Sequence, residues 1–383
     1  MKPLFQIIIL AVVLLHCTRQ ELVGQEKDNT PKFVNEFLNI GVGARAHGMF
    51  GSVVASVDDV TAGFWNPAGL TEIDAPFQAS AMHAEWFGGI ANYDYIAFGK
   101  KLGTTEKKSF GSISFIRMGV DNIPNTLSLI GPDGTVNYDN LTEFSVADYA
   151  LLASYARELR SNLSVGGSVK IIRRAYGFGS AWGFGADLGA KYRMGNFTLG
   201  LMAKDVTSTF NAWKFNFSES DKDVFLQTGN IIPISSTEIT LPRLIIGANY
   251  HSKSDNVSWM VEANLNLSTN GQKAGVFSGK SVSLDPTVGV EVGLSNKVFV
   301  RAGIGNIQKI VNEVNTQNTD LSLQPNVGLG LNLGRINIDY ALTNIGDATD
   351  VLVSHIFSVK LDFISNRKVS TAPTQGKDVE IID

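Results

Sequence analysis

The sequence predicts an all-β protein, a transmembrane antiparallel β-barrel of about 14 strands with an N-terminal plug, and three observations lead to this prediction. From residue 76 onward, apolar residues alternate with small or polar ones in segments of about ten residues, which suits tilted membrane strands. After residue 25, no apolar run is long enough for a transmembrane helix. Long and short connections alternate between the segments, as the outer loops and periplasmic turns of outer-membrane barrels do.

The composition excludes several classes of protein. Only 18% of the 383 residues are charged, against about 25% in ordinary globular chains. Glycine, with 38 residues, makes up about 10% of the chain, against about 7% in ordinary chains. A formal charge of −4 without a basic cluster argues against a nucleic-acid partner. Cys17 is the only cysteine, which excludes disulfides within the chain and iron–sulfur clusters, and the five histidines lack metal-ligand spacing. We therefore expect no enzyme activity and no catalytic, metal or cofactor-binding residues.

Both ends of the chain differ from the strand-rich part. Lys2 and the apolar run Leu4–Leu15 predict a signal peptide over residues 1–25, so we expect export to the outer membrane. The barrel is predicted over residues 76–364, with both termini in the periplasm. The polar residues 365–383 are predicted to form a short periplasmic tail.

The strands predict which residues face the interior of the barrel. In Val327–Leu333, every second residue is valine or leucine, and the others are glycine or asparagine. An apolar face of this kind suits membrane lipid, and a face of small residues suits a filled interior. The charged residues of the polar face have mixed signs, which favours internal ion pairs over an ion filter; they are Lys170, Asp187, Lys191, Lys204, Glu262, Glu291, Arg301, Asp339, Lys360 and Asp362.

Residues 26–75 precede the first strand and are apolar enough to need cover, so we expect them to fold into the barrel as a plug or hatch. A turn is predicted at Asn66-Pro67-Ala68-Gly69, where Pro67 fixes φ, the Asn66 side chain closes an Asx-turn and Gly69 permits a positive φ. Trp65, just before it, would anchor the turn against the wall. The motif is either a plain structural turn or a plug element that gates a path.

The longest predicted connection, residues 206–239, is unusually aromatic. It contains Phe210, Trp213, Phe215 and Phe217, more than a solvated loop needs. The loops could pack on one another over the barrel mouth, or these residues could form a docking surface for a protein partner.

Three stretches carry a resemblance to a known family. Phe37–Arg45 (FLNIGVGAR), Ala55–Asp59 and Thr61–Leu70 (TAGFWNPAGL) resemble the PorV/PorQ family of Bacteroidota outer-membrane proteins. That family has a FadL-like barrel with an N-terminal plug, and FadL-type fatty-acid transporters share the Asn-Pro-Ala turn. The resemblance implies a component of the type IX secretion system that binds the C-terminal sorting domains of secreted cargo leaving the translocon. His47 and Phe50 depart from the family's smaller residues, which affects the expected plug conformation.

Two functions therefore compete. One is a non-enzymatic secretion component whose partners are membrane lipid, a translocon subunit and cargo proteins. The alternative is a FadL-like passive transporter with a hydrophobic small-molecule ligand in its lumen, such as a long-chain fatty acid or a hydrocarbon. A transporter of that kind needs a continuous apolar pocket behind the plug. The mixed charges predicted for the lumen favour secretion.

Overall fold

The computed structural model describes residues 34–363 except 105–106, 127–128, 130–134, 228, 230, 233, 270–281, 312–318 and 344–352. The predicted signal peptide and C-terminal tail lie outside these residues. In the described part, no helix is long and apolar enough to cross a membrane. The strands are β1 (Phe77–Trp86), β2 (Ala91–Lys101), β3 (Ser109–Asn125), β4 (Thr142–Arg160), β5 (Leu163–Tyr176), β6 (Gly179–Met194), β7 (Phe197–Lys204), β8 (Phe210–Phe215), β9 (Ser235–Ile239), β10 (Arg243–Lys253), β11 (Val257–Ser268), β12 (Ser283–Leu294), β13 (Val298–Val311), β14 (Thr319–Asn332), β15 (Ile336–Thr343) and β16 (Ser354–Phe363).

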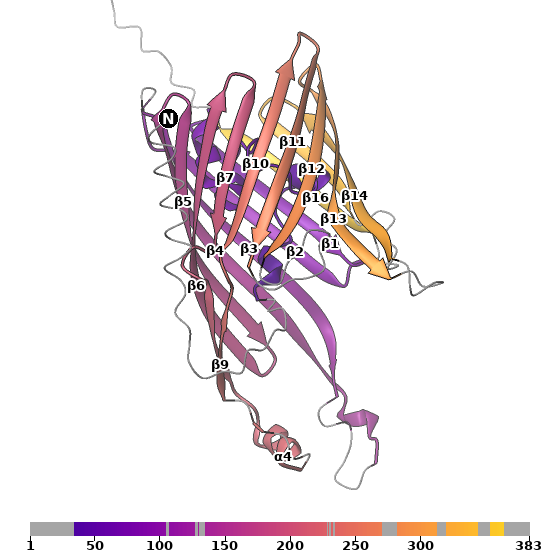
Figure 1. Ribbon diagram of the computed structural model, residues 1–383. Coiled ribbons are helices and arrows are strands. Elements are labelled where there is room, and N and C mark those ends of the chain that lie inside the picture. The colour runs from indigo at the N-terminus through magenta and orange to yellow at the C-terminus, as the bar shows by residue number, and fades with distance from the viewer. Residues whose placement is uncertain are drawn as a thin grey trace, which may run out of the picture. The chain divides into compact units, whose positions relative to one another are not determined.

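The strands form one closed antiparallel ring (Figure 1). β1 pairs with both β2 and β16, and the pairing of β5 with β6 completes the circle. β7 and β8 pair with successive parts of β6, so together they occupy one position in the ring. β10 pairs with β7 and β9 pairs with β8, so β9 and β10 together occupy the next position. The ring therefore has 14 positions, and the predicted fold class is confirmed.

The connection predicted over residues 206–239 is wrong in part. Phe210–Phe215 is the strand β8 and Ser235–Ile239 is β9, with the short helix α4 (Glu219–Gln227) between them. Asn211 and Trp213 alternate with exposed residues, as in any strand of this wall. The aromatic residues concealed this period because both faces of the strand carry large side chains. The wall is therefore taller beside β6 than the sequence predicts.

The two rims of the ring differ in their connections. The rim with α4, which we call the long-loop rim, also carries the connection between β3 and β4, where a one-turn 3-10 helix, η3 (Tyr138–Asn140), lies (Figure 1). At the opposite rim, the short-turn rim, β4 joins β5 through residues 161–162 and β6 joins β7 through residues 195–196. Two connections at the long-loop rim are short, residues 87–90 between β1 and β2 and residues 177–178 between β5 and β6. Apart from these, the sorting is typical of outer-membrane barrels.

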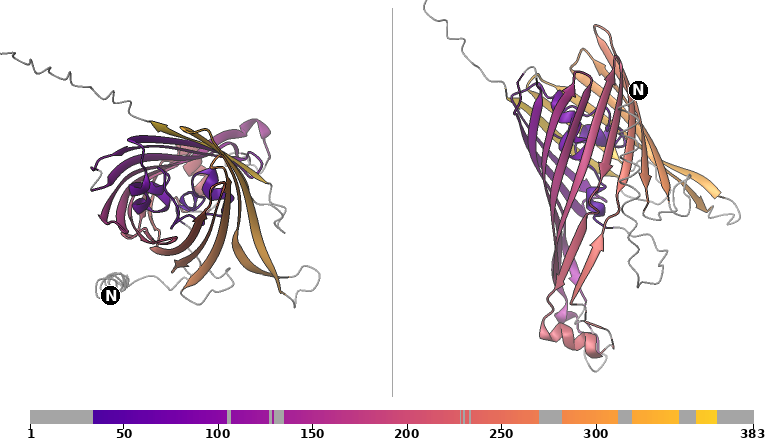
Figure 2. Two further views of the ribbon diagram at one scale, coloured as in Figure 1. Left: turned by 90° about the horizontal axis from the view of Figure 1, so that it is seen from above. Right: turned by 60° about the vertical axis from the view of Figure 1, so that its left-hand side comes forward.

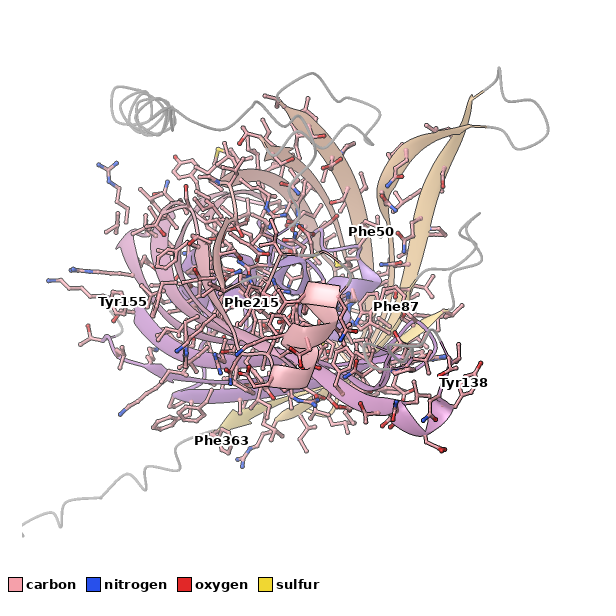
Figure 3. All side chains as sticks on the ribbon, turned by 90° about the horizontal axis from the view of Figure 1, so that it is seen from below. Phe50, Phe87, Tyr138, Tyr155, Phe215 and Phe363 are labelled. Carbon is pink, nitrogen blue, oxygen red and sulfur yellow. The ribbon has the colours of Figure 1, made fainter. Side chains whose placement is uncertain are left out.

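The outer face of the ring is an apolar belt. Exposed residues such as Phe98, Ile113 and Leu329 alternate with buried ones along their strands. Figure 3 shows Tyr155 and Phe363 on the outside of the wall. A soluble protein rarely exposes so large an apolar area, whereas a lipid-facing barrel surface requires one. The predicted inward and outward faces of these strands are correct.

The first described residues, 34–75, lie inside the ring and are called the inner segment (Figure 2). They contain four one- or two-turn helices, η1 (Glu36–Leu38), α2 (Ala44–Gly48), α3 (Ala62–Trp65) and η2 (Pro67–Glu72). α2 packs against β13 to β16, and η2 packs against β3 to β6 on the other side. The hydrophobic core is formed between this segment and the inner faces of the strands.

Candidate functional site

Polar side chains of the wall bind the backbone of the inner segment from most sides. The Gln78 carboxamide accepts from Val60 N at 2.7 Å, and the Glu262 carboxylate accepts from Ala55 N at 2.8 Å. Other bonds of this kind join Ala44 N to Ser358, Gly63 O to Ser154 and Ser168, His47 O to Asn326, and Val57 O to Lys191. Short helices leave many backbone groups unpaired, so these bonds supply the partners that the segment's own structure lacks.

Wall glycines allow the inner segment to approach closely. A Cβ atom built at Gly166 would lie 2.6 Å from the carbonyl carbon of Pro67, and one at Gly200 would lie 2.5 Å from the Val54 oxygen. Gly189, Gly247, Gly289, Gly303, Gly305 and Gly328 likewise face the inner segment. The glycine-rich inner face of the strands is therefore a docking surface for backbone.

The motif Trp65 to Gly69 lies on this glycine surface. The Asn66 Oδ1 accepts from Ala68 N at 3.2 Å, so the predicted Asx-turn is present, and its Nδ2 donates to Val54 O at 2.8 Å. Trp65 Nε1 donates to Val42 O at 2.8 Å. The predicted positive φ at Gly69 is wrong: it lies within η2, where a Cβ would collide with Val57 O. The structure gives this motif a packing role, and gating by it stays a prediction.

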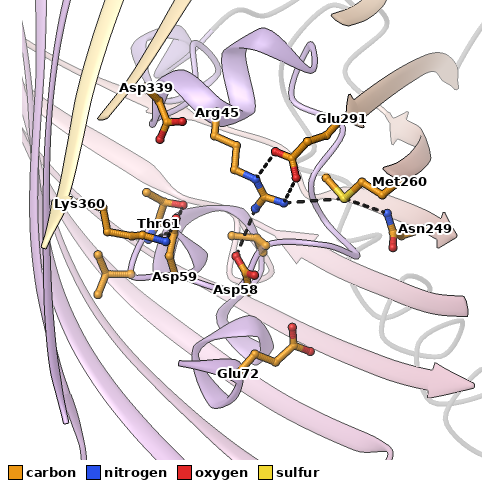
Figure 4. Close-up of polar contacts among 12 residues, drawn as sticks. Arg45, Asp58, Asp59, Thr61, Glu72, Asn249, Met260, Glu291, Asp339 and Lys360 are labelled. Carbon is orange, nitrogen blue, oxygen red and sulfur yellow. Dashed lines mark hydrogen bonds and ion pairs between the residues drawn. The ribbon is translucent and has the colours of Figure 1, made fainter. Parts of the chain in front are cut away.

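A chain of ion pairs joins the inner segment to β12, β13 and β15, and Figure 4 shows the part of it around Arg45. Arg45 Nε lies 3.0 Å from Glu291, which also pairs with Arg301 at 2.5 Å, and Arg301 reaches Asp339 at 2.6 Å. Arg45 also pairs with Asp58 at 3.2 Å. The predicted pairing of internal charges is confirmed for this group.

Asp59 links the segment to β16. Its carboxylate accepts from the Thr61 hydroxyl at 2.5 Å and from Thr61 N at 2.9 Å, and Lys360 Nζ lies 3.9 Å away. Burial alone would raise the pKa of Asp59, but Lys360 and the Thr61 hydrogen bonds hold it below its ordinary value. The carboxylate therefore stays charged down to acidic pH.

His47 makes the position of α2 sensitive to acid. Burial lowers the pKa of His47 to about 4, although the contact with Gly41 O at 3.3 Å opposes this. Because the folded-state pKa lies below the unfolded value of about 6.5, the stabilisation is complete above pH 6.5 and is lost as the pH falls toward 4, by roughly 3 kcal/mol at most. We expect hydrogen exchange of residues 44–50 to accelerate over that range. His47→Gln, which keeps a donor and does not titrate, should remove most of the change; an unchanged profile in this variant would contradict the assignment.

A cavity of about 500 Å³ lies between the inner segment and the long-loop ends of β10 to β15. Its floor includes Phe50, Val54 and Trp65. Its wall is mostly polar, with carboxamides on β11, β13 and β14, and with Asp285 and Thr287 on β12. The cavity therefore combines polar groups on the strands with an apolar floor, and no wholly apolar pocket is found among the described residues of the lumen. The sequence did not single out this cavity, because its lining comes from strand ends far apart in the chain.

The wall has a break beside one end of this cavity. β6 pairs with β7 from Leu188 onward and with β8 up to Phe184, and the residues between belong to neither ladder. Opposite them, Asp205 and Ser208 have positive φ, and Val206 N donates to Ala186 O at 2.9 Å.

Buried charges fill the inner side of the break. Lys170 Nζ lies 2.8 Å from Asp187 and 2.5 Å from Asp205, and all three side chains are at most 5% exposed. Lys204 lies 4.0 Å from the centre of the Phe64 ring. On the lipid side, a groove of about 400 Å³ lies over β4, β5 and β6, and three of its lining residues, Ala153, Gly167 and Ala186, are small.

The aromatic residues near α4 stack on one another. Trp213 lies 4.9 Å from Tyr176, and Phe217 lies 5.1 Å from Phe178 and 4.9 Å from Phe225, measured between ring centres. Trp213 and Phe217 are buried, Phe215 is half-buried and Phe210 is exposed on the outer face. This packing favours the first of the two interpretations of the aromatic residues, and docking of a partner stays a prediction.

Solved structures with a similar fold include transporters and channels. The Ralstonia pickettii toluene transporter TbuX has a TM-score of 0.51 at 14% identity, over 84% of this chain and 98% of that protein. The monoaromatic hydrocarbon channel CymD has a TM-score of 0.53 at 12% identity, over 85% and 98%. A Pseudomonas aeruginosa FadL homologue has a TM-score of 0.50 at 12% identity, over 84% and 98%. The chain has the FadL-like barrel fold.

No protein-family model and no curated protein matches the sequence. The similar structures support the FadL-like part of the predicted resemblance. The narrower PorV/PorQ assignment stays a prediction. Identities of 12–14% establish the fold of this FadL-like barrel and leave its ligand to be argued from its own residues.

Proposed function

We propose that this FadL-like barrel is a passive outer-membrane transporter that takes small hydrophobic molecules at the long-loop rim and releases them sideways through the wall. The observation that carries the proposal is the break between β6 and its partners β7 and β8; the cavity lies beside it on the inside, and the outer groove lies over β6 and its other neighbours, β5 and β4. A small space on the inner side of the break is lined by Lys204, Arg243 and Asp187, among others. Lys204 and Arg243 also line the 500 Å³ cavity, and Asp187 also lines the groove.

The fold supports this route in a second way. Lipid offers no hydrogen-bond partners, so a wall must be fully paired unless side chains replace the missing ladder. At the break, Asp187 Oδ1 accepts from Asp205 N at 2.7 Å and Thr209 Oγ1 donates to Asp205 at 2.5 Å. Side chains can move without unfolding a strand, so the wall can open at the break without loss of a strand. The transporters and channels that share the fold carry toluene or monoaromatic hydrocarbons, as their names state.

Uptake by whole cells tests this proposal. We expect radiolabelled toluene or oleate to enter a Gram-negative host that expresses the protein faster than the same host with an empty vector. Ala186→Trp, which fills the outer groove, should return uptake to the vector level. Ala263→Trp places the same ring on the lipid face of β11, away from the break, and should leave uptake unchanged. Equal uptake with and without the protein would refute transport of these molecules.

Secretion is the second candidate, and one specific observation supports it. Leu226, Ile231 and Ile234 are 66–92% exposed around α4, at the end of the wall extension formed by β8 and β9. Exposed apolar side chains in such a place suit a protein partner. Affinity purification from the native outer membrane tests the role: recovery of a translocon subunit or of cargo with C-terminal sorting domains would support it. Recovery of the barrel alone, with a lipid or hydrocarbon bound, would support transport.

A further inference from the structure

Carboxamide side chains form a band around one side of the 500 Å³ cavity. Three nearby parts of the wall, β11, β13 and β14, each contribute two of them. The six residues are Asn264, Asn266, Asn306, Gln308, Gln324 and Asn326. Thr287 and Asp285, opposite Asn264 and Asn266 on β12, continue the band between these strands. Each carboxamide offers two donors and a strong acceptor without a charge.

A β-bulge places two of these groups in the cavity. Along β13, Arg301, Gly303 and Gly305 face inward, so the strand period alone would turn Asn306 and Gln308 outward. The register shifts between Gly305 and Gln308, and Asn306 has φ 50°, which reverses the facing side at this point. Bulges often redirect side chains at functional sites. The bulge therefore turns Asn306 and Gln308, which the strand period would place on the outer face, toward the cavity.

These amides are connected to one another. Gln308 Nε2 donates to Asn306 Oδ1, and Asn306 Nδ2 donates to Gln324 Oε1 at 3.2 Å. A donating and accepting chain of this kind fixes the orientation of its members before a ligand arrives.

Other polar atoms of the lining have no hydrogen-bond partner among the described residues. Asn326 is 6% exposed and uses its Nδ2 on His47 O, which leaves its Oδ1 unpaired. Thr343 Oγ1, at 1% exposure, and Trp86 Nε1 are unpaired as well. A buried polar group without a partner costs about 1–3 kcal/mol. These atoms have almost no accessible surface, so a ligand pairs with them only when neighbouring side chains shift; a ligand that donates and accepts hydrogen bonds can then satisfy them, and a hydrocarbon cannot.

The remaining lining sets the charge and shape that a ligand must have. Glu36 and Asp285 offset Lys204 and Arg243, so the formal charges of the lining sum to zero with His47 neutral. Trp65 and Trp86 add flat apolar surfaces beside the amides. Vicinal hydroxyls on a ring with an apolar face match both features: the hydroxyls pair with carboxamides, and the ring packs on indole.

We propose that this cavity binds a neutral sugar, presented as a free oligosaccharide or as the end of a glycan, at the long-loop mouth of the barrel. A peptide fits less well, because an extended peptide gains affinity by pairing with a free strand edge, and the closed ring offers none inside. The inference goes beyond transport of hydrophobic molecules, since binding in the cavity does not require the wall to open.

A printed array of neutral and acidic oligosaccharides, probed with the full-length protein in lipid nanodiscs, tests the inference. We expect signals on neutral glycans, at least tenfold weaker for Asn306→Ala/Gln308→Ala. Asn256→Ala, an exposed amide at the short-turn rim, is the matched control and should bind like the original protein. Titration of the strongest array glycan should also change the tryptophan fluorescence through Trp65 and Trp86.

Three outcomes would overturn the proposal. They are no neutral glycan bound above background, a preference for acidic glycans, or equal binding by the double variant and the control. Tight binding of a peptide library in place of glycans would point to a protein ligand instead. The array measures binding alone, so a negative array result would overturn glycan binding without bearing on transport. A negative uptake result would refute transport of the tested molecules without bearing on glycan binding.

Discussion

Gly166→Val is expected to expel the turn at Asn66 to Gly69 from the wall and to expose the inner segment to protease, whereas Gly167→Val leaves it in place. The two glycines are neighbours on β5 but face opposite sides. A Cβ at Gly166 would meet the backbone of Pro67 and Ala68 at 2.6–2.7 Å, and backbone cannot rotate away. A Cβ at Gly167 would lie 3.3 Å from the flexible Leu188 side chain on the lipid side.

The expected difference is large because overpacking against backbone is hard to relieve. Such changes cost about 1–3 kcal/mol and sometimes more, and here the turn would also lose the bond from Asn66 Nδ2 to Ala190 O. Limited proteolysis of both variants in nanodiscs, followed by mass spectrometry of the fragments, measures the effect. Cleavage within residues 34–75 should appear in Gly166→Val alone. Equal resistance of the two variants would mean that the contact with the glycine surface does not hold the segment.

The sequence predicted the barrel well because each strand is a local pattern. Alternation along Val327–Leu333 depends on one face meeting lipid and the other meeting the lumen, and both are visible in the order of residues. The ring of 14 positions follows, since a membrane wall must close. The mixed signs of the inner face predicted that internal charges would form ion pairs. They did not predict which residues would pair, because residues far apart in the chain, such as Arg45 and Glu291, are brought together only by folding.

The candidate site was largely beyond the reach of the sequence for the same reason. The cavity is lined mainly by the ends of β10 to β15, and no segment of the chain contains more than a few of its residues. The bulge at Asn306 reverses the period on which the inward and outward assignments depend, so the strand pattern points the wrong way there. The break beside β6 is equally concealed, because β8 resumes the wall after a few residues and its aromatic residues resemble a loop surface.

Lys170→Met should destabilise the barrel strongly. It would leave Asp187 and Asp205 buried, close together and without their shared cation. Removing one partner from a buried ion pair costs about 3–5 kcal/mol, because the remaining charge has lost its solvent and its partner. Lys222→Met is the matched control: its pair with Glu219 is equally short, at 2.7 Å, but Glu219 is 89% exposed, so about 0.5 kcal/mol or less is expected.

The temperature at which the folded barrel changes its mobility on a detergent gel measures this difference, and hydrogen exchange at residues 204–209 locates it. Adding Asp187→Asn and Asp205→Asn to Lys170→Met removes the two unpaired carboxylates and should restore much of the stability, since neutral amides can keep hydrogen bonds to Thr209 and the backbone N of residue 205. The same variants connect stability to function. If the break is the exit route, Lys170→Met should raise toluene uptake in proportion to the faster exchange at 204–209, and the neutral triple variant should lower it again. Faster exchange without faster uptake would mean that the break opens but does not conduct, and the sideways route would have to be abandoned.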